Sequence, residues 1–287
     1  MLQGKVAIVT GGANGIGRAS VLALAKGGAD IAIWDIDLPR MVSAAAEAQA
    51  LGRRVTTSEV DVTQWGQVEA AARGAGETFG RIDILAAVAG GSGTTPTYLS
   101  RDEETGRYTY SQEGMRQLWT EEIREEDWDG TLDYNLKAVF LCCKAVIPWM
   151  KKQHSGAIVT FSSIGASVGA AHSAFAYAAY AAAKAGVTGL TRHLSRELGP
   201  FGIRINCVSP GWVGNERMEV RRQEFQAALE EMKAKGLPVP PDARVWNPLG
   251  RPSTTEEQAN AVAFLASDAA SYISGVTLEV NGGAYVR

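Results

Sequence analysis

Short apolar runs alternate with amphipathic, alanine-rich segments along the first ninety residues of the chain. Each apolar run is rich in β-branched residues and is followed by glycine or acidic residues, which predicts a buried strand. These runs occupy residues 5–10, 30–35, 55–60 and 82–89. The segments between them have helical spacing and occupy residues 15–28, 39–51 and 63–79, with Thr63 as the expected N-cap of the third.

The alternation breaks after the fourth run and then returns. Apolar residues have no clear period in 91–124. A long helical pattern then runs from 125 to about 150, despite Pro148. The sequence Ser253-Thr-Thr-Glu256 has the form of a capping box and predicts a helix from there to Ala266. The further expected elements are strands at 156–161, 203–208 and 276–280, a small-residue helix at 174–199, and an irregular or helical section at 212–248.

Strands that alternate with helices favour β-α-β units, and such units form parallel sheets. The predicted strands are nearly continuous apolar runs, as expected for a sheet that is buried on both faces. We find no internal repeat, linker or low-complexity tail. The pattern therefore predicts an α/β fold. A single domain over residues 1–287 would contain one doubly wound parallel sheet (a Rossmann fold), with helices on both faces and a long insertion, 92–124, after strand four.

Composition narrows the functional classes. The 287 residues carry a formal net charge of −3 with no basic block, which argues against nucleic acid or an anionic membrane as a partner. The three cysteines are odd in number and two are adjacent, so neither a disulfide framework nor a metal site is indicated. The N-terminus lacks the long apolar region of a signal peptide, and the alanine-rich stretch 164–183 is too weakly apolar for a membrane span. We expect a soluble, cytoplasmic protein without a metal.

A glycine-rich loop follows the first predicted strand, with the sequence Thr10-Gly-Gly-Ala-Asn-Gly-Ile-Gly17. Glycines let the backbone turn sharply and approach a pyrophosphate, and the N-terminus of the following helix offers unpaired N–H groups and a positive dipole end. The strand–turn–helix context favours a dinucleotide-binding loop over a glycine-rich turn without a ligand. The expected cofactor contacts are Gly11, Asn14, Gly15, Ile16 and Gly17.

Acidic residues end the second and third predicted strands. Asp35 can accept hydrogen bonds from the hydroxyls of an adenosine ribose and repels a 2′-phosphate, which favours NAD over NADP. Asp37 and Arg40 lie nearby, and Arg40 is able to meet a phosphate, so NADP stays open as an alternative. Asp61 and Val62 end strand three at the same edge, where an adenine would lie, although a helix-flanking acid is nearly as good an interpretation of Asp61.

Tyr180 and Lys184 are the candidate chemical pair. They lie four residues apart in the predicted helix 174–199, so they share one face. A free tyrosine titrates near ~10, and a neighbouring cation favours the phenolate and lowers that pKa. The spacing therefore indicates a tyrosine tuned for proton transfer, although the spacing alone more often belongs to ordinary helix packing.

Together these motifs resemble those of the short-chain dehydrogenase/reductase family over nearly the whole chain. Residues 92–124 and much of 212–247 lie outside the resemblance. The matching motifs are the Gly11/Gly15/Gly17 spacing, Asp35, Asn135 in Tyr134-Asn-Leu-Lys137, Ser162-Ser163 after strand five, Tyr180 with Lys184, Pro210-Gly211, and Asn281-Gly-Gly283. Several ordered motifs in one chain favour the chemical interpretation of Tyr180 and Lys184 over packing.

The resemblance implies a role for each of four residues. Tyr180 is similar to the general acid/base that exchanges a proton with the substrate oxygen, and Lys184 to the lysine that lowers its pKa and holds the nicotinamide ribose. Ser163 is similar to the residue that hydrogen-bonds the reacting carbonyl or alcohol. Asn135 is similar to the residue that bends its helix and anchors a proton-relaying water. No metal is implied, because the cofactor carries the hydride chemistry.

The family pattern also implies cofactor contacts beyond the glycine loop. These are Ala89 and Gly90 after strand four, and Pro210, Gly211 and Val213 after strand six. The chain departs from the family where strand four ends in Ala87-Val-Ala-Gly90, since family members usually carry two asparagines before Ala-Gly. Hydrophobic filling of that space is the expected replacement.

A second departure concerns the serine. Ser163 lies seventeen residues before Tyr180, against about thirteen in the family, and Ser167 lies at thirteen. Ser163 is preferred because it directly follows the strand. Tyr177 has no lysine four residues further on, so Tyr180 is preferred as the acid/base.

Two segments outside the resemblance are expected near the substrate. The insertion 92–124 follows the carboxyl end of a strand, where α/β sheets bind ligands, so a lid is one interpretation and a surface elaboration or subunit contact is the other. The section 212–247 resembles the place where family members carry a mobile flap over the substrate, and a solvated helix is the alternative.

The sequence thus predicts an oxidoreductase that transfers a hydride between NAD(H) and a secondary alcohol or its ketone, with Tyr180 as general acid/base. One alternative is an NADPH-dependent carbonyl reductase of the 3-oxoacyl type, against which Asp35 argues. Another is a dinucleotide-binding sensor without catalysis, against which the complete set of catalytic residues argues. The expected partners are a small-molecule alcohol or ketone and, from the resemblance, further copies of the chain in a homotetramer or homodimer.

Overall fold

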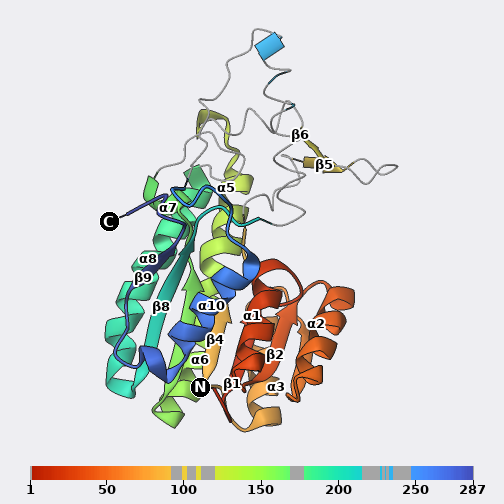
Figure 1. Ribbon diagram of the computed structural model, residues 1–287, viewed down its shortest axis with the longest axis vertical. Helices are drawn as coiled ribbons and strands as arrows, with labels where there is room; N and C mark the ends of the chain where they lie inside the picture. The colour runs from red at the N-terminus through yellow and green to blue at the C-terminus, as the bar shows by residue number, and fades with distance from the viewer. Residues whose placement is uncertain are drawn as a thin grey trace.

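The fold is built on a seven-stranded, all-parallel sheet with helices on both faces (Figure 1). This confirms the predicted α/β class with a doubly wound parallel sheet. The computed structural model describes residues 2–91, 99–101, 108–110, 120–168, 178–214, 227, 230, 233–234 and 247–286, with the backbone alone at 99–101 and 108–110. No helix among these described residues is long and apolar enough to cross a membrane.

The order of the strands in the sheet indicates where a ligand-binding site is expected. It runs β3-β2-β1-β4-β7-β8-β9, so the chain reverses its direction of winding between β1 and β4, and folds of this kind bind ligands at the carboxyl ends of the strands beside that point. The strands are β1 Val6–Thr10, β2 Asp30–Asp35, β3 Val55–Glu59, β4 Ile84–Ala87, β7 Gly156–Phe161, β8 Ile203–Pro210 and β9 Thr277–Val280.

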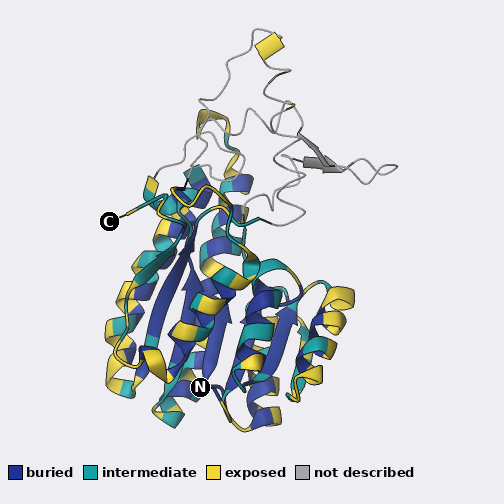
Figure 2. Ribbon diagram, viewed as in Figure 1, coloured by how far each residue is buried: buried dark blue, intermediate teal, exposed yellow. Residues whose placement is uncertain are grey.

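Two hydrophobic cores lie on the two faces of the sheet. Alternate residues of β1 show the division, because Val6 and Ile8 belong to one core and Ala7 and Val9 to the other. The first core is closed by α3 Trp65–Phe79, α6 Ala138–Gln153 and α8 Ala178–Leu198, and the second by α1 Gly15–Lys26, α2 Leu38–Ala50 and α10 Thr255–Ala266. The central strands are buried throughout, as Figure 2 shows, which explains their continuous apolar sequences.

The single helical pattern predicted from 125 to about 150 is three consecutive elements. They are α5 Glu125–Leu132, a π-helical turn Asp133–Lys137, and α6. A short helix, α7 Gly165–Val168, follows β7, and 3₁₀ turns occupy Thr120–Glu122, Gly199–Phe201 and Asp268–Ala270. The other predicted strands and helices match the structure to within a few residues where the chain is described.

Two predicted helix caps are wrong. The N-cap of α3 is Gln64, without a side-chain hydrogen bond, whereas Thr63 donates its N–H and its hydroxyl to Asp61 Oδ1 at 2.9 and 2.7 Å. The Asp61 carboxylate thus competes successfully for the groups of Thr63. The capping box of α10 begins one residue later than predicted, at Thr254, with Glu257 as its second member.

The stretch 91–124 was predicted without regular elements, and this is also corrected. Strands β5 Leu99–Arg101 and β6 Tyr108–Tyr110 pair antiparallel in a separate two-stranded sheet. The rest of the insertion up to Trp119 lies outside the described residues, as do most residues of 215–246. The predicted lid and flap therefore stay predictions.

Candidate active site

Tyr180 and Lys184 lie together on the buried face of α8. Their relative exposures are 8% and 4%, and the Lys184 ammonium is 5.7 Å from the centroid of the Tyr180 ring. Lys184 Nζ donates a hydrogen bond of 3.1 Å to the carbonyl oxygen of Phe161, the last residue of β7. The predicted pair therefore sits at the carboxyl end of a central strand.

The buried position of Lys184 changes its acidity. Burial lowers the pKa of Lys184 from 10.5 to about 8, and the smaller effect of Cys207 acts in the opposite direction. Desolvation disfavours the charged form of an amine. Its ammonium is thus easier to deprotonate than that of an exposed lysine, and the positive charge beside Tyr180 depends on pH in a range close to neutrality.

The two serines after β7 have different surroundings. Ser162 is buried, and its hydroxyl donates to the backbone oxygen of Lys184 at 2.9 Å. Ser163 is only partly buried, and its Oγ accepts a hydrogen bond from Gly165 N at 3.1 Å, which leaves the hydroxyl proton available for another acceptor. Ser162 thus fastens β7 to α8, while Ser163 suits a substrate contact. Ser167, the competing serine, lies one turn further along, inside α7.

Asn135 connects the π-helical turn to the end of β4. It is fully buried, its Oδ1 accepts from Gly91 N at 2.9 Å, and its Nδ2 donates to Gly91 O at 3.2 Å and to Thr131 O at 3.1 Å. A β-carbon added at Gly90 would lie 3.0 Å from Asn135 Oδ1 and 3.2 Å from Lys184 Nζ. Asn135, Gly90 and Lys184 therefore meet at one place.

The glycine loop between β1 and α1 has the geometry that its sequence predicts. Gly11 and Gly15 have φ values of 64° and 54°, in the left-handed region that glycine tolerates. A β-carbon at Gly17 would lie 1.8 Å from the oxygen of Gly11, so only glycine fits there. Asn14 caps α1 by accepting from Gly15 N, Ile16 packs on the core, and the first turn carries no acidic residue. An unopposed helix N-terminus of this kind fits a pyrophosphate.

Asp35 ends β2 directly beside this loop. Its Oδ2 accepts from Ala13 N at 2.9 Å, and its Oδ1 accepts from Ile36 N and Asp37 N at 2.8 and 3.0 Å. A carboxylate offers roughly four acceptor positions. Three are used within the chain, so in this geometry about one remains for a ribose hydroxyl, and the carboxylate is held in a fixed orientation.

The basic residues near Asp35 are paired. Arg40, the residue that kept NADP open as an alternative, donates from Nη1 to Asp37 Oδ2 at 2.8 Å. Arg18, in the first turn of α1, forms an ion pair with Glu47 of α2. Both cations are therefore partly neutralised by acids of this chain.

The remaining predicted cofactor contacts lie at the carboxyl ends of β3, β4 and β8. Val62 is buried and follows Asp61, whose Oδ1 is bonded to Thr63. Ala89 N donates to Thr10 Oγ1 at 3.0 Å, a contact that sequence analysis missed because threonine is common at strand ends. Pro210 O accepts from Ile164 N at 2.9 Å, Gly211 N donates to Val280 O at 3.2 Å, and Val213 forms an isolated bridge with Ser253.

The donor set as a whole fits a nicotinamide dinucleotide. The loop offers N–H groups to a pyrophosphate, Asp35 an acceptor to a ribose, and Lys184 a cation beside Tyr180. The described residues contain no cluster of three potential metal ligands. Further residues that the sequence suggests near the substrate or cofactor lie outside the described residues, namely Tyr98, Trp119, His172, Phe175, Tyr177 and Asn215, and Tyr108 is described only by its backbone.

Comparison with known proteins gives one consistent answer. The family model described as short chain dehydrogenase matches residues 5–226. The chain is 33% identical over 283 residues to the 3-oxoacyl-(acyl-carrier-protein) reductase of Thermotoga maritima, covering 98% of each protein. It is 36% identical over 298 residues to the cyclohexanol dehydrogenase of Rhodococcus sp. strain TK6, covering 98% of this chain and 96% of that one.

Solved structures of similar proteins share this fold. Levodione reductase superposes with a TM-score of 0.79 at 30% identity, covering 99% of this chain and 98% of that chain. A structure of NAD⁺-bound xylitol dehydrogenase superposes with a TM-score of 0.79 at 27% identity, covering 98% of this chain and 99% of that chain.

Proposed function

The chain belongs to the short-chain dehydrogenase/reductase family, and we propose that this oxidoreductase oxidises a secondary alcohol, or reduces the corresponding ketone, with NAD(H) as its cofactor. The family assignment and the oxidoreductase class follow from the comparisons. We infer the choice of NAD, the residue roles and the substrate class from the site of this chain.

The position of Asp35 is the observation that carries the choice of NAD. Its carboxylate is fixed against the glycine loop by Ala13 N, where the adenosine ribose of a bound dinucleotide would lie. A 2′-phosphate would meet this negative charge, and Arg40 is engaged by Asp37. The similar structure of NAD⁺-bound xylitol dehydrogenase supports the same choice, and the similarity to cyclohexanol dehydrogenase supports a secondary alcohol as substrate.

Several groups of the chain would hold the dinucleotide. Asp35 and Asp61 with Val62 would hold the adenosine end, and Lys184 would donate to the nicotinamide ribose. The proposed contacts are Gly11, Asn14, Gly15, Ile16 and Gly17 for the pyrophosphate, and Ala89, Gly90, Tyr180, Pro210, Gly211 and Val213 for the nicotinamide end. Bound NAD supplies the hydride acceptor for alcohol oxidation.

The proton chemistry belongs to the protein. In alcohol oxidation the Tyr180 oxygen accepts the hydroxyl proton of the substrate as general base, and in ketone reduction it returns that proton. The Lys184 charge stabilises the phenolate. The Ser163 hydroxyl donates to the substrate oxygen and orients it. Asn135 holds the backbone of Gly91 and the π-helical turn, and so supports the wall beside Lys184.

We further propose that residues 1–287 form a single domain, with 92–124 and 212–247 shaping the substrate site, and that the protein is a homotetramer or homodimer as in its family. These segments differ most from the family pattern and follow strand ends where α/β sheets bind ligands. They are therefore the parts of the chain that we expect to decide substrate choice.

A second candidate function is reduction of a 3-oxoacyl thioester with NADPH. The similarity to the Thermotoga maritima reductase favours it, whereas Asp35 disfavours it. One assay separates the two candidates: initial rates with NAD⁺ and NADP⁺ over a panel of secondary alcohols, and with NADH and NADPH over ketones and a 3-oxoacyl thioester. Efficient turnover with the phosphorylated cofactor alone would replace the proposed function by the second one.

A further inference from the structure

A group of contacts at the start of α10 joins the two sides of segment 215–246. We call it the clasp and define it as Trp212–Gly214 on one side, and Arg251, Ser253, Glu257 and Gln258 on the other. Val213 and Ser253 form an isolated parallel bridge. Ser253 N donates to Trp212 O at 3.0 Å, and Gly214 N donates to Ser253 O at 2.8 Å. Residues far apart in sequence are thus paired through their backbones.

Gln258 holds Ser253 from the helix side. It is fully buried, and its Nε2 donates both to Ser253 Oγ at 2.8 Å and to Val280 O, at the end of β9, at 2.9 Å. Because both amide protons are used, the position of Ser253 is set relative to the sheet. Asn247 adds a further tie by donating from Nδ2 to Arg251 O at 2.8 Å.

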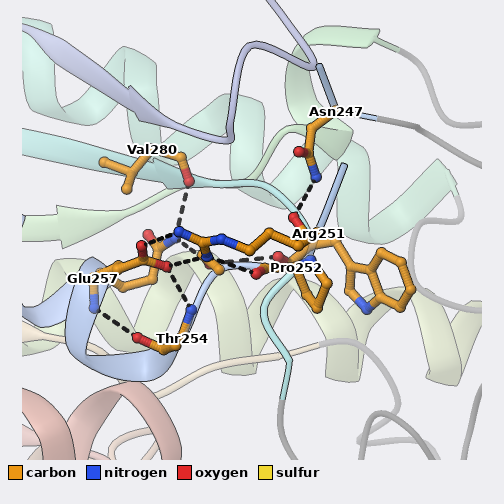
Figure 3. Close-up of polar contacts among 9 residues, drawn as sticks. Asn247, Arg251, Pro252, Thr254, Glu257 and Val280 are labelled. Atoms are coloured by element: carbon orange, nitrogen blue, oxygen red, sulfur yellow. Dashed lines mark hydrogen bonds and ion pairs between the residues drawn. The ribbon is translucent and has the colours of Figure 1, made fainter. Parts of the chain in front are cut away.

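Arg251 and Glu257 close the clasp with a bidentate ion pair (Figure 3). Arg251 Nη1 is 2.8 Å from Glu257 Oε2, and Nη2 is 2.6 Å from Oε1. Glu257 Oε2 also accepts from Thr254 N at 2.8 Å as part of the capping box. These contacts lower the pKa of Glu257 to about 2, with the Arg251 hydrogen bonds as the main cause. Both side chains are exposed, at 54% and 40%, and Arg251 Nη1 also donates to the oxygen of Pro252 at 3.1 Å, directly before Ser253.

The clasp is connected by backbone bonds to the proposed active site. Trp212 directly follows Pro210 and Gly211, and Gly211 N donates to Val280 O at 3.2 Å. Pro210 O accepts from Ile164 N at 2.9 Å, and Ile164 directly follows Ser163. A shift of Trp212–Gly214 would therefore be transmitted to the end of β8 and to the loop that carries Ser163.

We propose that Arg251 and Glu257 are positioning residues for hydride transfer: their ion pair fixes Ser253, and Ser253 fixes Trp212–Gly214 beside the proposed nicotinamide contacts. The proposal rests on the proposed function. Neither residue touches the reacting groups. Their effect is on orientation at the nicotinamide end, where a displacement of about 1 Å can cost about 10²-fold in rate, and it leaves the distant Asp35 end of the dinucleotide site unchanged.

The test compares Glu257→Gln with Glu256→Gln. Glutamine at position 257 keeps an acceptor for the capping box but loses the ion pair with Arg251. Glu256→Gln removes the same charge from the same helix turn and leaves the clasp intact. The readouts are kcat for a secondary alcohol with saturating NAD⁺, and the Kd of ADP-ribose by calorimetry. ADP-ribose contains the adenosine and the pyrophosphate but lacks the nicotinamide.

We expect Glu257→Gln and Arg251→Gln each to lower kcat about 10-fold, with the Kd of ADP-ribose changed less than about 2-fold. Arg251→Lys, which keeps a single charged contact, should fall between wild type and Arg251→Gln, and Glu256→Gln should match wild type in kcat. Unchanged kcat in Glu257→Gln, or equal losses of kcat and ADP-ribose affinity, would overturn the positioning role. Absence of NADH formation by the wild-type protein with every alcohol would instead overturn the proposed function, and with it the role of the clasp in hydride transfer.

Discussion

The Lys184 ammonium is held 3.1 Å from the backbone oxygen of Phe161, at the carboxyl end of a central strand. The carbonyl is a neutral acceptor, so it satisfies one ammonium proton without supplying a negative charge. Burial therefore dominates the acidity of this lysine and lowers its pKa to about 8. The position beside Tyr180 thus has a stability cost as well as a chemical use.

Replacement of Lys184 by methionine should remove that cost, so the difference in unfolding free energy between wild type and the variant should depend on pH. The folded-state pKa is depressed from 10.5 to about 8, so below pH 8 both states hold the proton and the full desolvation cost is present. Between these two pKa values the unfolded chain binds more protons, and wild-type stability rises with pH. From pH 7 to pH 9 wild type should gain on the order of 1 kcal/mol relative to Lys184→Met.

Urea unfolding of both proteins at the two pH values measures this gain. Burial raises the pKa of the Cys142 and Cys143 thiols in the folded state of both proteins, so their contribution cancels to a first approximation in the difference. A difference in unfolding free energy that stays constant from pH 7 to pH 9 would show that Lys184 has an ordinary pKa in the folded protein.

Asp35→Asn should relax the cofactor preference. The variant removes the negative charge that a 2′-phosphate would meet, and we expect kcat/KM for NADP⁺ to rise about 10- to 100-fold, since a nearby charge repulsion of a few kcal/mol is lost. Adding Asp37→Asn releases Arg40 from its ion pair and should raise NADP⁺ use further. Steady-state kinetics with both cofactors provide the measurement. If wild type and Asp35→Asn discriminate equally, Asp35 is not the specificity residue.

Ser163→Ala should lower kcat by about 10²-fold, because removal of one donor to a developing oxyanion has an effect of that size. Ser167→Ala should stay within about 3-fold of wild type, because Ser167 lies one turn away inside α7. Initial rates of the two variants with one secondary alcohol decide between the serines. The opposite ranking would assign the substrate contact to Ser167.

Asp83→Ala should destabilise the fold by about 2–3 kcal/mol, because a buried N–H and a charge-assisted hydrogen bond lose their acceptor. Asp83 is 3% exposed, accepts from Val6 N at 2.9 Å, and binds Arg81 at 2.7 and 2.6 Å. Arg40→Ala, which breaks an exposed pair, is the matched control and should change stability by less than about 1 kcal/mol. Equal losses in thermal unfolding would contradict this assignment.

The central strands of the sheet were predictable because they are buried on both faces and so carry nearly continuous apolar sequences. The capping box of α10 shows a choice of N-cap residue that the local sequence does not decide. Ser253-Thr-Thr-Glu-Glu257 contains two overlapping boxes, one residue apart. Ser253 is committed to the bridge with Val213, so Thr254 caps the helix. A contact distant in sequence thus selected between two locally equivalent choices.

The residues of the site were predictable where the types and the spacing of side chains are distinctive. Helical spacing places Tyr180 and Lys184 on one face, and glycines mark the loop before α1. The partners of these groups were not predictable, because Phe161, Gly91 and Pro210 act through backbone groups that every residue possesses. The π-helical turn around Asn135 was missed for a related reason, since one widened turn leaves the apolar pattern of the surrounding helix almost unchanged.

The most direct test of Tyr180 as the general acid/base is the rate of NADH formation from NAD⁺ and a secondary alcohol by wild type and Tyr180→Phe, with ADP-ribose binding measured in parallel. We expect turnover by wild type, a loss of about 10³-fold or more in kcat on removal of the phenol oxygen, and similar ADP-ribose affinity in both proteins. Wild-type turnover retained by Tyr180→Phe would contradict this role.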